Sequence, residues 1–276
     1  MNEPIADDQA QGLRRRLHVV PPPAGRAIAV LSGKGGVGKT FVSTSLAVLA
    51  ARRGERVVIV DGDLGLANVD VVLRTCARFT IEDVIAGRCS LQDAIVKGAQ
   101  GVSLLTAGSG VAASTRLDDA QRRGLAAAVA DLRGRFDLVI LDCGAGIGDN
   151  VLFLATLAGS SLLVLTPEPT SMVDGYATIR ALSDVGQTDV DVVVNCTGSE
   201  LDARDTYNRL GAVVARFLPS QLRFVGGIPR DDVVRRSVMA RRPVVDEEPG
   251  SRAARALGCV ADKLFARQPF ARAGAI

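Results

Sequence analysis

The sequence predicts an α/β fold: a single doubly wound, mostly parallel sheet with helices on both faces. Two observations support this fold class. Short apolar, β-branched runs alternate along the chain with longer segments of helical period. The runs are apolar at nearly every position, which is typical of strands covered on both faces rather than on one. Because no internal repeat or second composition regime interrupts this pattern, we expect one domain over residues 26–266.

The elements follow in order from the apolar runs and the helical segments between them. Strands are predicted at 27–31, 56–60, 102–105, 138–141, 162–165, 190–194 and 222–225. Helices are predicted at 41–53, 118–133, 171–182, 203–217 and 251–265. The uncharged stretch 151–167 is short and carries hydroxyl residues, so it predicts a helix end, a Gly-Ser turn and a strand rather than a membrane span.

Both ends of the chain are predicted to be tails. Residues 1–25 finish in Pro21-Pro22-Pro23, which cannot continue a helix and forms a stiff spacer. This flexible N-terminal segment lacks the apolar core of a signal peptide, so we expect a cytoplasmic protein. Residues 267–276 form a C-terminal tail in which Pro269 interrupts any helix. Its apolar face is small, so membrane contact at the inner membrane or cell pole is expected to be weak and conditional.

The composition excludes several classes of protein. With 33 Lys plus Arg against 30 Asp plus Glu, the net charge of +3 is too small to imply nucleic acid as a direct partner. The five cysteines show no CxxC spacing, so neither a zinc site nor a disulfide framework is expected. We interpret them as small buried hydrophobic residues. Only four of the basic residues are lysines, and two of those stand together in a glycine-rich segment.

That glycine-rich segment directly follows the first predicted strand and precedes a helix. It reads Ser32-Gly33-Lys34-Gly35-Gly36-Val37-Gly38-Lys39-Thr40. The pattern GxGxxG, with Asp61 at the end of the second strand, is typical of dinucleotide binding. The pattern GxxxxGK[ST] fits as well and demands more: backbone N–H groups converge on phosphate oxygens, the lysine reaches the β and γ phosphates, and the threonine hydroxyl binds Mg²⁺.

Carboxylates at the ends of neighbouring strands favour the second interpretation. Asp142 follows the strand at 138–141, from where it can orient Mg²⁺ directly or through water. Asp61 and Asp63 close the second strand, and one of them is placed to position an attacking water. Guanine specificity would require NKxD, whereas Asn195 is followed by Cys196, so we favour ATP. A redox protein that binds NAD remains an alternative.

Lys34 inside the loop resembles the extra lysine in the deviant phosphate loop of the MinD/ParA family of dimerising P-loop ATPases. The similarity covers about residues 26–260. It implies an ATP-dependent homodimer in which Lys34 reaches the partner's phosphates, Asp63 organises the hydrolytic water and Asp142 holds the magnesium. The residues implied to bind the nucleotide are Gly33, Gly35, Gly36, Val37, Gly38, Lys39, Thr40, Phe41, Asn195 and Pro229. Lys34, Lys39, Asp63 and Asp142 are implied to be catalytic, and Thr40, Asp63 and Asp142 to bind the metal.

The N-terminal tail indicates a branch of that family. Its segment at 8–14 matches DQAxxLR and resembles the activator motif of the flagellar-number branch, FlhG or FleN. The resemblance implies that the tail binds an FlhF-type GTPase through Asp8, Gln9, Ala10, Leu13 and Arg14. It also implies a flagellar transcription regulator as a partner.

Besides the NAD-binding redox protein, one other function stays open at this stage. A division or partitioning ATPase of the same fold would act on a membrane or DNA surface. An iron–sulfur carrier is disfavoured by the lack of CxxC, with Cys143 left as a ligand that a dimer could share.

Overall fold

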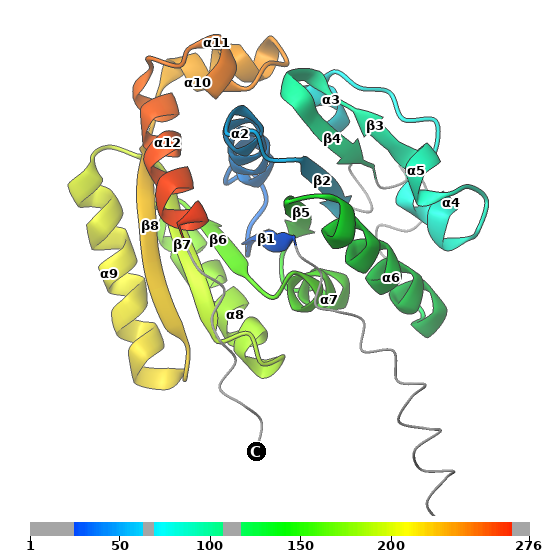
Figure 1. Cartoon of the computed structure of the whole chain (residues 1–276). Coiled ribbons are helices and arrows are strands. Elements are labelled where there is room, and N and C mark those ends of the chain that lie inside the picture. The colour runs from blue at the N-terminus through cyan, green and yellow to red at the C-terminus, as the bar shows by residue number, and fades with distance from the viewer. Residues whose placement is uncertain (1–24, 63–68, 107–116, 267–276) are drawn as a thin grey trace, which may run out of the picture.

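An eight-stranded sheet runs through the part of the chain that the computed structural model describes, residues 25–62, 69–106 and 117–266. The strand order is β3-β4-β2-β5-β1-β6-β7-β8, and every pair is parallel except the antiparallel pair β3 and β4 (Figure 1). The predicted α/β fold is therefore confirmed. The strands are β1 Arg26–Ser32, β2 Val57–Gly62, β3 Ile95–Lys97, β4 Val102–Leu105, β5 Leu138–Ala145, β6 Ser161–Leu165, β7 Asp189–Thr197 and β8 Gln221–Pro229.

Helices cover both faces of this sheet and bury a core on each side. Strand β1 shows the principle, because Ala29 and Leu31 belong to one core cluster and Ile28 and Val30 to the other. The helices are α2 Lys39–Arg52, α3 Val69–Leu73, α4 Ile81–Ile85, α5 Leu91–Ala94, α6 Asp119–Arg135, α7 Asp149–Ala158, α8 Pro169–Asp184, α9 Glu200–Phe217, α10 Asp232–Met239, α11 Val244–Glu247 and α12 Arg252–Phe265, with a short 3₁₀ turn η1 at Ala99–Gly101.

The two helical layers are distinct in Figure 1. Helices α4 to α9 contribute to one cluster, whereas α2, α3, α11 and α12 contribute to the other. The predicted helices and strands are all present, and β5, β7 and β8 extend beyond their apolar runs toward the carboxyl edge of the sheet. Those extensions carry the polar residues that build the site.

The segment 151–167 confirms the predicted helix, turn and strand. Helix α7 ends at Gly159, whose φ of 73° is the left-handed conformation usual at a helix C-terminus, and β6 follows. Within the described ranges, no helix is both long and apolar enough to cross a membrane.

The ends of the described domain meet at the amino edge of the sheet. Arg26 opens β1, and its guanidinium donates a 2.9 Å hydrogen bond to the carbonyl oxygen of Phe265, the last residue of α12. The guanidiniums of Arg26 and Arg53 lie 4.9 and 5.2 Å from the centre of the Phe265 ring. Helix α12 is thereby fixed beside the first strand, at the edge opposite the glycine-rich loop.

Candidate nucleotide-binding site

The glycine-rich loop lies at the carboxyl end of β1, in the middle of the sheet between β5 and β6. In open parallel sheets this is where ligands bind, because connections leave the central strand toward both sides. Gly36 and Gly38 have φ of 79° and 95°, which L side chains rarely adopt. Gly38 precedes α2 without a side-chain cap, so the first N–H groups of that helix remain available to an anion.

The loop is packed tightly against its neighbours. A Cβ added to Gly38 would lie 2.4 Å from Nδ2 of Asn195, and one added to Gly33 would lie 2.3 Å from the carbonyl oxygen of Asp174. Asn195 is buried at the end of β7 and donates a 2.9 Å hydrogen bond to the carbonyl oxygen of Val37. Asn195 therefore holds the phosphate loop, and its expected contact with adenine stays a prediction.

Thr40 and Asp142 come together as a magnesium site requires. The Thr40 hydroxyl donates to Oδ2 of Asp142 at 2.7 Å, and the buried hydroxyl of Ser43 donates to Oδ1 at 2.8 Å. Oxygen donors of this kind suit Mg²⁺, which neutralises charge on phosphate oxygens. The residues present therefore fit the ion. The contact of Ser43 with Asp142 was not predicted from the sequence, although the i, i+3 spacing of Thr40 and Ser43 places both on one helix face.

The second strand places another carboxylate beside Asp142. Asp61 is buried at the end of β2, in register with Asp142 of β5. Its Oδ2 accepts a 3.2 Å hydrogen bond from the backbone N–H of Val69, the first residue of α3. Asp61 thus has a structural role, because its carboxylate accepts a hydrogen bond from an N–H group in the first turn of α3. Asp63 lies outside the described residues, so its catalytic and metal-binding roles stay predictions.

The two lysines of the loop have different surroundings. Lys39 is the first residue of α2, whereas Lys34 lies at the exposed side of the loop. The Lys34 ammonium is 2.9 Å from Oε2 of Glu168 and 3.3 Å from the hydroxyl of Thr170. These partners are 134 and 136 residues away in the sequence, and their contact with Lys34 was not predicted.

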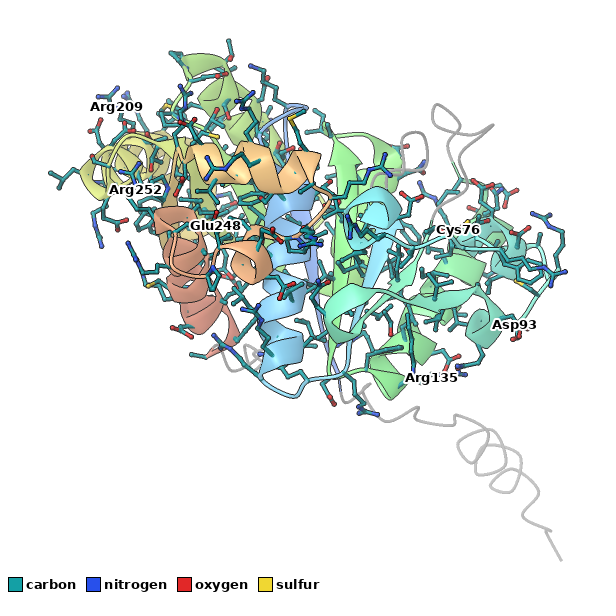
Figure 2. The ribbon with its side chains drawn as sticks, turned by 90° about the horizontal axis from the view of Figure 1, so that it is seen from above. Cys76, Asp93, Arg135, Arg209, Glu248 and Arg252 are labelled. Carbon is teal, nitrogen blue, oxygen red and sulfur yellow. The ribbon has the colours of Figure 1, made fainter. Side chains whose placement is uncertain are left out.

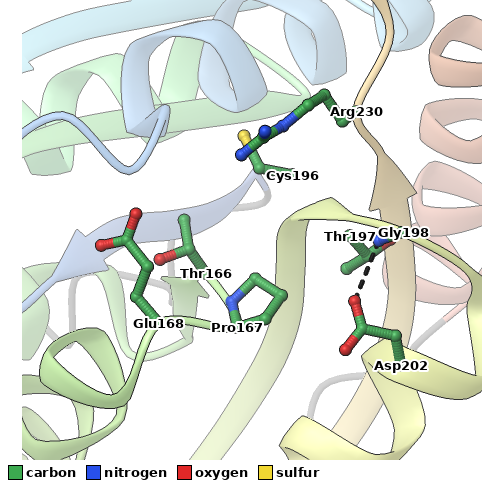
Figure 3. A pocket seen from close by; sticks show the side chains of 8 residues that line it. All are labelled: Thr166, Pro167, Glu168, Cys196, Thr197, Gly198, Asp202 and Arg230. Carbon is green, nitrogen blue, oxygen red and sulfur yellow. Dashed lines mark hydrogen bonds between the residues drawn. The ribbon is translucent and has the colours of Figure 1, made fainter.

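A cavity of about 320 Å³ opens at the carboxyl ends of β6, β7 and β8 (Figure 3). One of its lining residues, Glu168, also contacts Lys34 of the glycine-rich loop, and another, Cys196, directly follows Asn195. In Figure 3 the Arg230 guanidinium and the Cys196 thiol lie together on one side, facing Glu168 on the other. Pro229 pairs with Thr197 of β7 at the rim. The cavity is lined by Thr166, Pro167, Glu168, Cys196, Thr197, Gly198, Asp202 and Arg230.

Phe41 follows Thr40 in the first turn of α2. Its ring is partly buried and packs against the core cluster beneath α2. Its implied contact with the nucleotide therefore stays a prediction. Val37, by contrast, is fully buried and fixes the middle of the loop to the same core.

The cysteines depart from the expectation that all are buried. Cys143 is buried, and burial together with the neighbouring Asp142 carboxylate raises the pKa of its thiol. A core thiol of this kind is not placed to ligate a cluster shared between subunits. Cys76, Cys196 and Cys259 are exposed, so the expectation was wrong for them, and Figure 2 shows Cys76 at the periphery. Although Cys196 is exposed as a residue, its thiol is partly shielded from water by its surroundings, and this desolvation raises the pKa of the thiol.

The remaining predicted contacts fall in the tail. Asp8, Gln9, Ala10, Leu13 and Arg14 lie outside the described residues.

Fold and site together define a P-loop nucleotide hydrolase. A family model for ParA, described as NUBPL iron-transfer P-loop NTPase, matches residues 24–265. The antiactivator FleN of Pseudomonas aeruginosa is 42% identical over 240 residues, 87% of this chain and 86% of that protein. The flagellum site-determining protein YlxH of Helicobacter pylori is 29% identical over 216 residues, 78% of this chain and 73% of that protein.

A solved structure agrees with these relatives. The septum site-determining protein MinD of Pyrococcus horikoshii, complexed with Mg-ADP, superposes with a TM-score of 0.73 at 28% identity and covers 87% of this chain and 96% of its own. The chain belongs to the MinD/ParA family of P-loop ATPases, in its FlhG/FleN branch. It is an ATP hydrolase whose cofactors are ATP and Mg²⁺. The alternative of an NAD-binding redox protein is therefore overturned.

Proposed function

We propose that the chain is an ATP-driven switch that sets the number and placement of flagella. The observation that carries this proposal is the 42% identity to FleN along 86% of that protein's length. The switch binds Mg-ATP, dimerises and hydrolyses slowly in the cytoplasm, with conditional contact at the inner membrane or cell pole. It acts through an FlhF-type GTPase and a flagellar transcription regulator.

The described residues support a division of work within the nucleotide site. Lys39 and the loop N–H groups bind the phosphates, and Thr40 and Asp142 hold the magnesium, which offsets the charge that develops during phosphoryl transfer. The cavity lined by Cys196 and Arg230 takes the nucleoside, beside Asn195 and Pro229. Asp63 orients water, and Lys34 reaches the phosphates of a second copy.

Sedimentation in Mg-ATP tests the switch. The variant Asp63→Ala, which we expect to slow turnover, should form a dimer in ATP and a monomer in ADP. Lys34→Ala in that background should lose the dimer, whereas Lys263→Ala, at the far end of α12, should retain it. A monomer under all conditions would refute ATP-dependent dimerisation.

The GTPase arm is tested with the tail. GTP turnover by an FlhF-type GTPase should rise when the full chain is added, and should not rise with residues 26–276 alone. Gln9→Ala should remove most of the stimulation, and Gln11→Ala, at a position that the DQAxxLR pattern leaves open, should not. Equal stimulation by the full and shortened chains would count against the tail motif.

The same measurements separate a second candidate, a MinD-type division-site ATPase. The similarity to the P. horikoshii septum protein favours this alternative over other members of the family. ATP-dependent retention on liposomes, without any effect on the GTPase, would support it in place of the flagellar role.

A further inference from the structure

The Lys34 ammonium is already engaged within its own chain. Glu168, just before α8, contributes a carboxylate oxygen at 2.9 Å, and Thr170 contributes its hydroxyl oxygen at 3.3 Å. The side chains of Lys34 and Glu168 are 41% and 61% exposed. Either side chain can therefore change its conformation without moving a residue of the core. The ion pair is thus a surface contact that a competing anion can displace.

The backbone around this ion pair is held in place. The loop runs so close to α8 that a side chain at Gly33 would collide with the backbone of Asp174. The hydroxyl of Ser32 donates a 2.8 Å hydrogen bond to the carbonyl oxygen of Lys34, which fixes the start of the lysine side chain. Lys34 therefore extends from a rigid point toward the first turn of α8.

Among the described residues, the Glu168 side chain makes its hydrogen bond to Lys34 and none within that turn. It occupies the N-cap position of α8 but makes no side-chain hydrogen bond to the helix backbone, and Pro169 follows it. A carboxylate near a helix N-terminus is normally used to cap the helix. Here its hydrogen bond goes to Lys34 instead.

We propose that Glu168 is a positioning residue that holds Lys34 in a resting place and so opposes dimerisation. The proposal rests on the proposed function, in which Lys34 reaches the phosphates of a second copy. Lys34 carries a compact ammonium on a flexible stem, and in the proposed dimer it moves from Glu168 to a phosphate of the second copy. Each dimer that forms in this way breaks two of these ion pairs.

The expected effect is modest, because exposed ion pairs contribute little. Removing the Glu168 charge should tighten the ATP dimer by about two- to fivefold. The gain should shrink as ionic strength rises, since salt already weakens the resting contact. Thr170→Val should tighten it less, because a neutral hydroxyl at 3.3 Å is the weaker partner.

The test measures the dimer dissociation constant in Mg-ATP by sedimentation, in the Asp63→Ala background. Glu168→Gln should lower it, and Glu168→Ala should lower it as well. Glu200→Gln is the matched control, because Glu200 also begins a long helix and is similarly exposed, but pairs with Arg204. Its dissociation constant should not change.

Two further readouts exclude indirect effects. Thermal unfolding reports whether each variant is folded. The affinity of the monomer for ADP reports on the cavity, which Glu168 also lines.

The results distinguish the two ideas. If the parent dimerises and Lys34→Ala weakens the dimer, but Glu168→Gln leaves it unchanged or weaker, the resting contact is refuted and the switch survives. A tightened dimer with an equal gain in ADP affinity would also refute it. If the parent never dimerises, the proposed switch itself fails.

Discussion

Gly38 shows how narrowly single residues define the phosphate loop. Its φ of 95° requires a residue without a Cβ, and the space where a Cβ would stand is filled by the Asn195 amide at 2.4 Å. The same amide holds the loop through Val37. The backbone conformation at Gly38 and the packing around it therefore each require glycine at this position.

Gly38→Ala should destabilise the fold and abolish nucleotide binding. Gly54→Ala is the control, because Gly54 also has a left-handed φ, 83°, but open space around it. We expect a loss of about 1 kcal/mol for Gly54→Ala and about 3 kcal/mol for Gly38→Ala, since the second adds a collision. Chemical denaturation and ATP titration measure both. Equal losses would contradict a packing role for Asn195.

Ser43 donates to the Asp142 carboxylate oxygen that Thr40 does not contact. Ser43→Ala should raise the Mg²⁺ concentration for half-maximal ATPase activity about tenfold, because the carboxylate loses one of the hydrogen bonds that fix it. Ser45→Ala is the control on the same helix, since its buried hydroxyl has no hydrogen-bond partner among the described residues. A Mg²⁺ dependence that is the same in both variants would exclude this role.

The local part of the site could be predicted from the sequence, and the long-range part could not. Gly38, Lys39 and Thr40 form a contiguous pattern, and Asp142 ends an apolar strand that must lie near β1. Glu168 and Arg230 carry no such signal. They enter the site only because β6 and β8 end at the same edge, which depends on the strand order.

At the scale of elements, an ion pair between side chains helps to hold the edge strand β8 against its neighbour β7. Asp191 of β7 and Arg223 of β8 are opposite each other, and the guanidinium donates to both carboxylate oxygens at 2.6 and 2.9 Å. The carboxylate is buried and the arginine is half exposed. Edge strand β8 is thus attached to β7 by side chains as well as by its backbone.

Arg223→Met should lower the free energy of unfolding by about 2 kcal/mol, because it leaves a buried carboxylate without its principal cation. The loss is smaller than for a fully buried pair, since water reaches the arginine. Arg209→Met, which breaks the exposed contact of Arg209 with Asp205 on α9, should change stability by less than about 0.5 kcal/mol. Urea denaturation measures the free energy of unfolding of both variants. Equal losses would contradict the role given to Arg223.

Long apolar strands and long helices were predictable because periodicity extends over many residues. Strand β3 has only three residues and pairs antiparallel to β4, too short for any periodic signal. The short helices α4 and α5 were also missed. Each opens with a capping box, Thr80 with Asp83 and Ser90 with Asp93, and aspartate at the fourth position is less distinctive than the usual glutamate.

For the molecule as a whole, acid stability depends in part on the junction of β2 and β5. Arg56 donates hydrogen bonds from its side chain and its backbone N–H to Asp137, and they lower the pKa of that carboxyl to about 2. An unfolded aspartate titrates near 3.9. The stabilising contribution is therefore complete above about pH 4 and is lost as pH falls through 2.

Asp137→Asn should accordingly lower the Tm at pH 7 and have little effect at pH 2. Melting curves at pH 7, 4 and 2 measure the difference between the variant and the parent. Because the pair is exposed, added salt should reduce the difference at pH 7. A difference that is independent of pH would contradict the assignment.

Phe265 joins the two ends of the described domain, because it lies at the end of α12 and contacts Arg26 at the start of β1. Phe265→Ala removes a ring that contacts both Arg26 and Arg53, and should destabilise by about 2 kcal/mol. Phe217→Ala is the control, since that ring is 62% exposed at the end of α9. A loss as small as that of Phe217→Ala would mean that α12 is held by its buried face alone.

The contact between Arg26 and Phe265 also makes the chain suitable for circular permutation. A short glycine-serine linker could join the start of β1 to the end of α12, and new termini could be opened at the exposed turn around Gly186, between α8 and β7. Such a permutant would keep the nucleotide edge intact while separating the two native tails from the domain. Each tail could then be supplied as a free peptide.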